Sequence, residues 1–519
     1  MPATTLGQND GLVRAAAVLA IGNIASRTLG LIRETVKANL FGASGLLSAF
    51  EVAALVPTSL FDLIIGGMVN SALVPVFSEV AERRKEELWG LLSTVLSVAT
   101  AVLLIVVLLV EIFTPQIAWV VGANEFADAS LTAVAIRLMR LATPAVLFLS
   151  IASILTGALY ALKRFTLPAF VGATFNATVV AAALMWPERI DSLVWGLLAG
   201  SVLQVGLQLP ALRDARLRWQ FEWRHPAIGR ILLLYAPIVA GLVVNQLAVA
   251  FSFNLATRLG DQSVSYMKFA TTLTQFPLGL VVTAISIATL PTLSRLAIDQ
   301  LAAFKQTLAE GIRLVMALIL PATVGLFALA VPIVSLLFEH GAFTATDTVT
   351  TAQVLRVYLI GLPFAAVDQM LVFASYARKD TWRPALVGVV SILVYSVTAI
   401  ILAPITGLFS LMAADAVKHI VHTTIMLWLL QRYLGGLAGH GVALAIGKSL
   451  LAAAVTGVVA YGTAAWLLMH FPLTSFLYKF IVVSGGGSAG LLAYVLMVFV
   501  LNISEARSLR RLLSHRTPL

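Results

Sequence analysis

The segment Leu88–Val110 reads LWGLLSTVLSVATAVLLIVVLLV and contains no charged residue. An α-helix rises about 1.5 Å per residue, so roughly 20 apolar residues are enough to cross the hydrocarbon core of a bilayer. About fourteen apolar segments of this kind, separated by short charged loops, follow one another along the 519 residues. Because a backbone in lipid must satisfy its own hydrogen bonds, the sequence predicts an all-α polytopic membrane protein with about 14 transmembrane helices.

The composition excludes a soluble protein, since 60% of the residues are hydrophobic and only 11% are charged. The polar start Met1–Asp10 leads directly into an apolar segment too long for the core of a cleavable signal peptide. We therefore expect this segment to remain as the first span. Cysteine is absent, which excludes disulfides, thiolate nucleophiles and thiolate metal ligands.

Most of the 34 lysine and arginine residues fall in alternate loops, on one side of the predicted membrane. The basic positions on that side are Arg14, Arg83 to Lys85, Lys163, Arg164, Arg213 to Arg230, Arg295, Lys305, Arg313, Arg378, Lys379, Arg383, Arg432, Lys448 and the tail from Arg507. The loops on the other side contain only Lys37, Arg189, Arg258 and Lys479. This is the positive-inside pattern, and it predicts that both termini are cytoplasmic. Topology and contact with membrane lipids therefore explain the net charge of +10, and we expect no nucleic-acid partner.

Two stretches of the chain recur at an offset of 216 residues. Tyr160–Pro168 aligns with Tyr376–Pro384, and the two share Tyr, Ala, Lys and Pro. Ala72–Ser78 aligns with Ala288–Ser294 at the same offset. Six predicted spans fit in each period, and an even number returns the chain to the same side of the membrane. The sequence therefore predicts two parallel repeats related by an axis along the membrane normal.

This repeat divides the chain into two six-helix lobes, residues 1–221 and 222–434, and a C-terminal part, residues 435–519, with two more spans and a cytoplasmic tail. We expect the basic connector Arg213–Arg230 to include an amphipathic piece on the membrane surface. Transporters of this design bind their substrate between the lobes and rock around it. A membrane scaffold can also be duplicated, so this alternative stays open.

The first apolar segment carries two arginines, Arg27 and Arg33, in the sequence SRTLGLIRE. A guanidinium at membrane depth costs roughly 2.5–3.5 kcal/mol, and arginine cannot lose its proton to escape this cost. Its fork of N–H donors matches phosphate or carboxylate oxygens, so the pair predicts an anion-binding cavity. Six residues turn an ideal helix by about 240°, so convergence of the two side chains requires a bend, which Gly30 would permit.

Other charged and polar residues lie within the predicted spans. Glu51 and Asp62 are eleven residues apart and share one face of the second helix. They are also, with Glu34, the alternative ion-pair partners of the two arginines. Further pairs are Arg137 and Arg140 in the fourth span, Lys268 and Gln275 in the eighth, Arg356 and Asp368 in the tenth, and Asp415 and Lys418 in the twelfth. Asp415 and Lys418 are three residues apart, so we expect them to neutralise each other.

Two further patterns carry no chemistry. The run Gly485–Gly490 resembles a phosphate loop, but it lies in an apolar segment with no preceding strand, and we expect it to pack two helices closely. The glycosylation pattern at Asn176 lies within a span, so we take it as accidental. Neither a metal-ligand spacing nor a hydrolase elbow is found, so the sequence predicts no metal site, no cofactor and no enzyme.

The chain resembles the MurJ (MviN) family of lipid II flippases, within the multidrug, oligosaccharidyl-lipid and polysaccharide exporter superfamily. The resemblance covers most of the chain. It rests on Ser26–Arg33, Phe41-Gly-Ala, Pro57, Gly67, Ala72–Pro75, Phe276-Pro277, Leu290-Pro291, Leu337–Thr344 with Asp347, and Tyr376–Pro384. It implies a cationic cavity that opens to each side in turn and accepts a pyrophosphate-linked disaccharide peptide. The last two helices would form a groove for the polyprenyl tail.

The resemblance places Arg27 and Arg33 on the two important first-helix arginines of the family. Three other positions depart, because Ser48, Gly66 and Thr272 replace an aspartate, a glutamate and a third cavity arginine. In each case a charged residue one turn away is the expected substitute, namely Glu51, Asp62 and Lys268. The predicted substrate-binding residues are therefore Arg27, Arg33, Ser48, Glu51, Asp62, Lys268 and Gln275.

The leading hypothesis is a flippase of a bacterial plasma (inner) membrane that moves lipid II from the inner to the outer leaflet in cell-wall (peptidoglycan) biosynthesis. Cell-wall synthesis proteins are candidate partners. The family's sodium ligands have no match in Leu386–Leu402, so the coupling ion stays open between another gradient and the membrane potential. The alternatives are a flippase for another polyprenyl-linked oligosaccharide, a cation-coupled drug exporter and a non-transporting cell-wall scaffold.

Overall fold

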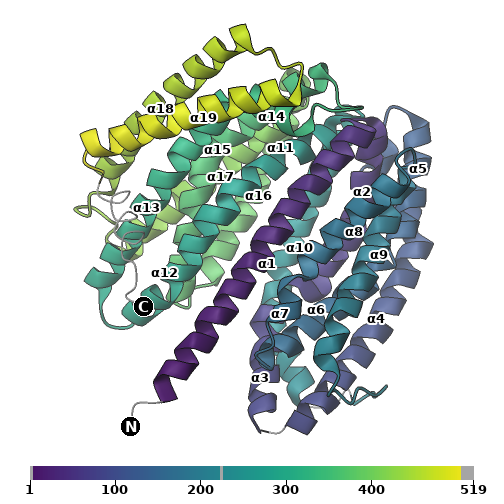
Figure 1. Cartoon of the computed structure of the whole chain (residues 1–519). Helices are drawn as coiled ribbons and strands as arrows, with labels where there is room; N and C mark the ends of the chain where they lie inside the picture. Colours follow the sequence, from purple (N-terminus) through teal and green to yellow (C-terminus); the bar gives the residue numbers. More distant parts are fainter. Residues whose placement is uncertain (1–3, 84, 223–225, 504–519) are drawn as a thin grey trace. The chain divides into compact units, whose positions relative to one another are not determined.

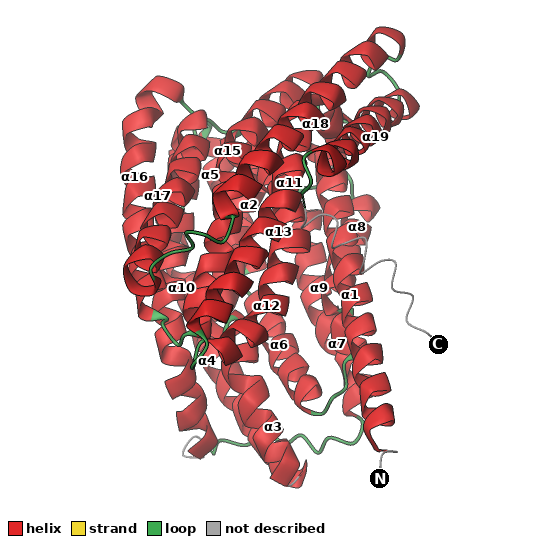
Figure 2. Ribbon diagram, turned by 90° about the vertical axis from the view of Figure 1, so that its left-hand side faces the viewer, coloured by secondary structure: helices red, strands yellow, loops and turns green. Residues whose placement is uncertain are grey.

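The computed structural model describes residues 4–83, 85–222 and 226–503, and every regular element in these ranges is helical (Figures 1 and 2). This confirms the predicted all-α class. Among the described residues, ten helices are long and apolar enough to cross a membrane, or eleven if one bent pair of segments counts as a single span. The count of fourteen stays a prediction. The tail from Arg507 and residues 223–225 of the connector lie outside the described residues.

The chain forms two compact units, Met1–Ser265 and Tyr266–Leu519. The first unit continues past the predicted lobe boundary at residue 221 because the next helix, Pro226–Arg258, packs on elements of the first unit, among them Asp62–Gly66, Val69–Leu73 and Lys85–Val120. The division by repeat, at residues 221 and 434, stays a prediction about ancestry and topology.

The first unit is built almost entirely from long helices. Its elements are α1 Thr4–Phe41, α2 Gly45–Phe61, the π segments η1 Asp62–Gly66 and η2 Val69–Leu73, α3 Val74–Arg83, α4 Lys85–Val120, η3 Ala123–Glu125, α5 Ala129–Ala142, α6 Ala145–Ala161, α7 Thr166–Ala169, α8 Val171–Met185, α9 Asp191–Gln208, η4 Leu209–Leu212 and α10 Pro226–Arg258. Within it α1 packs on α8, α8 on α9, and α2 on α5.

The second unit is also built almost entirely from long helices. Its elements are α11 Ser263–Pro277, whose first turn belongs to the first unit, the π segment η5 Leu278–Val282, α12 Thr283–Leu296, α13 Leu301–Ala328, α14 Ala330–Phe338, α15 Ala345–Ala377, α16 Trp382–Thr406, α17 Phe409–Leu434, α18 Val442–His470 and α19 Phe476–Val500. Here α15 and α16 both pack on α17, and α18 lies side by side with α19 (Figures 1 and 2).

The predicted repeat is visible in the local backbone of both units. The π segments η1 and η5 begin at residues 62 and 278, which differ by 216. Lys163 and Lys379, also 216 apart, both adopt a left-handed backbone, with φ of 58° and 61°. Each occupies the position after a helix end where glycine is usual. Two rare conformations therefore recur at the offset of the sequence repeat.

Both left-handed lysines close a Schellman motif with the same pattern of backbone hydrogen bonds. In the first unit the Lys163 N–H donates to the Tyr160 carbonyl at 2.9 Å and the Arg164 N–H to the Leu159 carbonyl at 2.8 Å. In the second unit the Lys379 N–H donates to the Tyr376 carbonyl at 2.9 Å and the Asp380 N–H to the Ser375 carbonyl at 3.0 Å. These bonds satisfy carbonyls that the helix end leaves unpaired.

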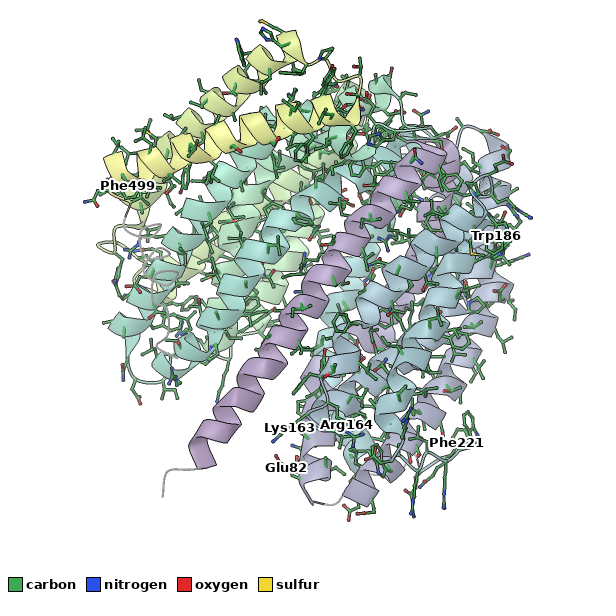
Figure 3. All side chains as sticks on the ribbon, in the orientation of Figure 1. Glu82, Lys163, Arg164, Trp186, Phe221 and Phe499 are labelled. Carbon is green, nitrogen blue, oxygen red and sulfur yellow. The ribbon has the colours of Figure 1, made fainter. Side chains whose placement is uncertain are left out.

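Basic loops of the first unit gather at one end, as the charge pattern predicts. Glu82, Lys163, Arg164 and Phe221 lie near one end of this unit in Figure 3, and Trp186 lies near the other. Residues 215–222 of the connector have no helical structure, so an amphipathic piece in this connector stays a prediction. This stretch is held along α4 instead, because its backbone N–H groups at Arg218 and Gln220 donate to hydroxyls of α4 at 3.1 and 3.0 Å.

The Leu337–Thr344 motif forms the turn between α14 and α15 in the second unit, which we call the corner. Gly341 has a positive φ of 57°, which favours glycine, and the Phe343 ring packs against Phe269 and Phe338. Thr344 then starts α15 with a capping box, in which Thr344 and Asp347 satisfy each other's backbone N–H groups. The residues that carry this part of the resemblance thus determine where α14 ends and where α15 begins.

Glu339 in this corner ties α19 to the rest of the second unit. Thr348 donates to one carboxylate oxygen at 2.6 Å, and Lys479 Nζ lies 3.3 Å from the other and 2.8 Å from the Glu339 carbonyl oxygen. The prediction that Lys479 lies in a loop is wrong, because it is a buried residue of α19. Burial by itself raises the pKa of Glu339, but the hydrogen bond from Thr348 and the charge of Lys479 outweigh burial and lower it.

The glycines of Gly485–Gly490 pack α19 closely on α18, as predicted. A Cβ atom on Gly486 would lie 3.1 Å from the Ala460 carbonyl oxygen, and one on Gly490 would lie 3.0 Å from the Ala460 Cβ. Both glycines are buried in the helix. Small residues here permit the two backbones to approach each other.

Because the pKa of Glu339 is lowered in the folded protein, its ionised form stabilises the fold above its ordinary pKa of about 4.3. This stabilisation is lost as the pH falls through the lowered pKa. We expect Glu339→Gln to reduce the unfolding temperature near neutral pH, and the difference from the wild type to shrink below about pH 4. Thermal unfolding of the purified protein between pH 3.5 and 8 measures this, with the exposed Glu188→Gln as control. A difference that does not depend on pH would contradict it.

Candidate functional site

Arg33 is held by three hydrogen bonds within the first unit. Its Nε and one terminal nitrogen donate to Glu34 Oε1 at 3.1 and 2.7 Å, and the other terminal nitrogen donates to Asn176 Oδ1 of α8 at 2.9 Å. Asn176 in turn donates to the Ser26 carbonyl at 3.0 Å, which fixes its amide between α8 and α1. A guanidinium has five N–H donors, so two of them remain for a ligand.

Lys37 connects Arg33 to the second helix through two carboxylates. Its Nζ lies 2.6 Å from Glu34 Oε2 and donates a hydrogen bond to Glu51 Oε1 of α2. Side chains of Lys37, Glu34 and Glu51 are 3%, 2% and 6% exposed, so this is a buried chain of alternating charges. We call Arg33, Glu34, Lys37 and Glu51 the α1 network. Its two positive and two negative charges sum to zero.

The predicted outer-loop position of Lys37 is wrong. Lys37 belongs to α1, which runs without a break from Thr4 to Phe41. It is buried because its ammonium group compensates two carboxylates that lie one turn away on α1 and on the neighbouring helix. The signal for it in the sequence is the unbalanced pair Glu34 and Glu51, since buried acids require a cation.

Arg27 and Arg33 do not converge on one point. Gly30 introduces no bend, because α1 is a single straight rod in Figure 1 and continuous α-helix through this glycine. A Cβ on Gly30 would lie 3.5 Å from the Asn176 amide, so this face of α1 is turned to α8. Arg27 Nε donates to Asn23 Oδ1, one turn earlier on α1, at 3.3 Å. Among the described residues Arg27 forms no ion pair, and it is the arginine of the two that keeps most of its donors.

Ser48 and Asp62 lie in different surroundings. The Ser48 side chain is fully buried, and its hydroxyl lies 2.9 Å from the hydroxyl of Ser265, which also donates to the Ser44 carbonyl at 3.0 Å. In this conformation Ser48 joins the start of α2 to the start of α11 and is not available to a ligand. Asp62, in the π segment η1, is exposed, and Gln246 of α10 donates a hydrogen bond to it.

Lys268 and Gln275 lie on α11, in the second unit. They are seven residues apart and share one face of the helix, with Thr272 between them. The hydroxyl of Thr272 donates to the Lys268 carbonyl at 2.9 Å, so it is used within the helix. Gln275 is exposed. The structure thus brings Arg33 and Glu51 together within the first unit, and Lys268 and Gln275 together within the second.

Asn176 is the site residue that sequence reasoning missed. Its amide is 9% exposed and makes the only hydrogen bonds of the described site that cross from α8 to α1. In the sequence it stands out only as an accidental glycosylation pattern. A buried amide needs polar partners, and a neighbouring span that carries arginines can supply them. This requirement is the signal in the sequence that indicates Asn176 as a site residue.

Removing Lys37 leaves Glu34 and Glu51 buried with one remaining cation, a loss of roughly 3–5 kcal/mol for a buried pair. We expect Lys37→Met to lower the free energy of unfolding by this order, and Arg27→Ala to leave it nearly unchanged. The double variant Lys37→Met/Glu51→Gln restores neutrality and should be more stable than Lys37→Met alone. Unfolding of the purified proteins in denaturant measures all three. Equal destabilisation by Lys37→Met and Arg27→Ala would contradict the network.

Comparison with known sequences finds relatives that are named lipid II flippases. A family model described as "Lipid II flippase MurJ" matches residues 37–481. A "Lipid II flippase MurJ" of Burkholderia cenocepacia is 30% identical over 411 residues, which are 76% of this chain and 79% of the relative. A "Probable lipid II flippase MurJ" of Rhizobium meliloti is 29% identical and the match covers 89% of this chain and 88% of the relative.

Solved structures show the same fold. The structure titled "Lipid II flippase MurJ, inward closed conformation" superposes with a TM-score of 0.77 at 24% identity, over 93% of this chain and 98% of that chain. An inward-facing multidrug resistance MATE family transporter of the MOP superfamily superposes with a TM-score of 0.67 at 13% identity, over 81% and 98%. At these identities the likeness concerns the fold alone. The match of the family model over most of the sequence goes further, and the chain belongs to the MurJ lipid II flippase family.

Proposed function

We propose that this chain moves lipid II, a polyprenyl-pyrophosphate-linked peptidoglycan precursor, from the inner to the outer leaflet of the bacterial plasma membrane by alternating access. The observation that carries the proposal is the match of the MurJ family model to residues 37–481. Translocation neither makes nor breaks a covalent bond, so the protein acts as a transporter, not as an enzyme, and it requires no cofactor. Its termini face the cytoplasm, which the excess of lysine and arginine in alternate loops supports.

Arg27 is the strongest candidate contact for the pyrophosphate. Its one described partner is the neutral amide of Asn23. A guanidinium without a carboxylate partner offers a full charge and most of its N–H donors to a phosphate. Arg33 retains two N–H donors, but its charge is already balanced by Glu34. We therefore assign Arg27 to charge recognition and Arg33 to orientation of the ligand.

The remaining predicted residues take secondary roles in this proposal. Lys268 supplies the third cation in place of the family's arginine, as a point charge without a bidentate fork. Gln275, two turns further along α11, is a neutral donor for the sugar or peptide part of the substrate. Glu51 and Asp62 position cations, and Ser48 supports the start of α2. Proteins of cell-wall synthesis are the expected partners for supply and use of the substrate.

The wild-type chain should restore growth and cell shape to bacteria depleted of their own lipid II flippase. Growth after depletion, with membrane insertion checked by immunoblot, is the measurement. Insertion without rescue would reject lipid II as substrate. A flippase for another polyprenyl-linked oligosaccharide, a drug exporter or a cell-wall scaffold would then be tested by accumulation of that glycolipid, by drug resistance and by co-purification.

Arg27→Ala and Arg33→Ala should each abolish rescue at normal protein levels, while Arg27→Lys should keep part of it because the charge remains. The matched control is Arg216→Ala, which removes an exposed arginine of the connector and should rescue fully. The same depletion assay measures all four variants. Full rescue by an Arg27→Ala/Arg33→Ala double variant would leave the anion site without support.

A further inference from the structure

A pocket lies at one end of α15, α16 and α17 in the second unit, where α15 and α16 both pack on α17 (Figure 2). Its most buried lining residues are Leu371 and Ala374 of α15 and Met426 and Leu434 of α17. All four are apolar, and we call them the floor of the pocket. None of the predicted substrate-binding residues lines this pocket, so it is separate from the predicted site.

Three charged side chains line the more exposed part of the pocket, and we call Arg378, Asp380 and Arg383 its rim. Arg383 Nη1 donates to Asp380 Oδ2 at 2.8 Å, and the Arg383 guanidinium lies over the Tyr433 ring, 3.9 Å from its centre. Arg378 is exposed and forms no ion pair with the described residues. Two arginines and one aspartate leave the rim with an unbalanced charge of +1.

Exposed aromatic side chains indicate at which level of the membrane the pocket opens. Trp382 of α16, Trp428 of α17 and the lining residue Tyr433 are 70%, 54% and 47% exposed. Tryptophan and tyrosine concentrate at the headgroup level of a bilayer. Further along α16 the exposed side chains are apolar from Leu386 to Ile401, as lipid-facing residues are. The pocket therefore opens at the headgroup level, and on the predicted topology this is the cytoplasmic leaflet.

In the first unit an ion pair joins the helix ends that correspond to this place. Arg164 donates to the two Asp214 carboxylate oxygens at 2.7 and 2.8 Å and to the Ala211 carbonyl, so it ties the turn after α6 to the segment after α9. At the repeat offset of 216 residues, Asp380 takes the place of Arg164. Leu430 takes the place of Asp214, and both replacements line the pocket. An aspartate and a leucine cannot form this ion pair, so the second unit keeps an open pocket there.

We propose that the rim and the floor of this pocket bind an anionic phospholipid of the cytoplasmic leaflet. Its phosphodiester accepts hydrogen bonds from Arg378 and from the N–H donors of Arg383 that Asp380 leaves free. Its single negative charge balances the +1 charge of the rim, and its glycerol and first acyl carbons lie on the floor. The bound lipid joins the ends of α15, α16 and α17, as the Arg164–Asp214 ion pair joins helix ends in the first unit. The site lies outside the predicted substrate-binding residues, so the inference stands independently of the proposed function.

Other anions fit this pocket less well. Inorganic phosphate has no apolar part, so it would leave the floor in contact with water. The pyrophosphate of lipid II carries more than one negative charge, whereas the rim offers a charge of +1. A zwitterionic phospholipid such as phosphatidylcholine fits the floor but brings its own positive charge, which the arginines repel. One excess positive charge beside an apolar floor thus selects a lipid with a net charge of −1.

The first test measures lipid binding to the purified full-length protein by native mass spectrometry, with dioleoylphosphatidylglycerol or dioleoylphosphatidylcholine added in an uncharged detergent. The wild type should bind phosphatidylglycerol roughly tenfold more tightly, because hydrogen bonds to charged groups add to the affinity. Arg378→Gln/Arg383→Gln should lose this preference. The matched control Arg295→Gln removes an exposed arginine of α12 outside the pocket and should keep it. A preference that persists in the double variant, or that the wild type lacks, would overturn the inference.

The second test locates the lipid and uses the absence of cysteine from the chain. Ser375 lines the pocket, so Ser375→Cys provides a single thiol there for a water-soluble maleimide. Phosphatidylglycerol should slow this alkylation several-fold, whereas phosphatidylcholine and inorganic phosphate should leave its rate nearly unchanged. The control is Ser294→Cys on α12, outside the pocket, which should react equally fast with all three additions. Equal protection by phosphatidylcholine or by inorganic phosphate, or no protection at all, would overturn the site.

The third test measures whether the lipid stabilises the fold. Phosphatidylglycerol, compared with phosphatidylcholine, should raise the unfolding temperature of the wild type and of Arg295→Gln, because a ligand stabilises the state that binds it. It should leave the unfolding temperature of Arg378→Gln/Arg383→Gln unchanged. Each protein is compared with itself in two lipids, so a variant of lower intrinsic stability still gives a result. An equal rise in all three proteins, or no rise in the wild type, would overturn the inference.

Discussion

Burying a charge in lipid is costly, and this constraint explains the ion pairs that join the helices. Each buried charge lies beside a partner of opposite sign or beside an amide. In the first unit the charges form a chain across α1 and α2, and in the second unit Lys418 neutralises Asp415 within α17, as predicted. Glu339 and Lys479 obey the same rule where α19 meets the corner before α15. The apolar packing supplies the body of the fold, while these pairs specify which helices are neighbours.

Duplication preserved the backbone of the two units better than it preserved their charges. The π segments and the left-handed lysines recur at an offset of 216 residues. The α1 network has no counterpart at that offset, because Val249 and Ala250 stand where Arg33 and Glu34 stand in the first unit.

The sequence was sufficient for the helical class, for the repeat and for the close packing at Gly485–Gly490, because each depends on composition or on short-range pattern. It was insufficient for Lys37, Lys479 and Asn176. Whether a lysine near the end of an apolar run lies in a loop or in a buried pair depends on residues far away in the chain, such as Glu51. The direction of Arg27 relative to Arg33 depends on the straightness of α1, which Gly30 left open.

Because α1 is straight, the directions of its two arginine side chains are coupled. Six residues of ideal helix separate them by about 240° around the axis, or 120° the other way. A rotation of α1 about its axis moves both guanidinium groups by the same angle, so a rotation that turns one toward a phosphate turns the other away. The ion pairs from Arg33 through Lys37 to α2 oppose that rotation, because they must break before α1 can turn. While α1 stays straight, its two guanidinium groups therefore cannot point in the same direction at once.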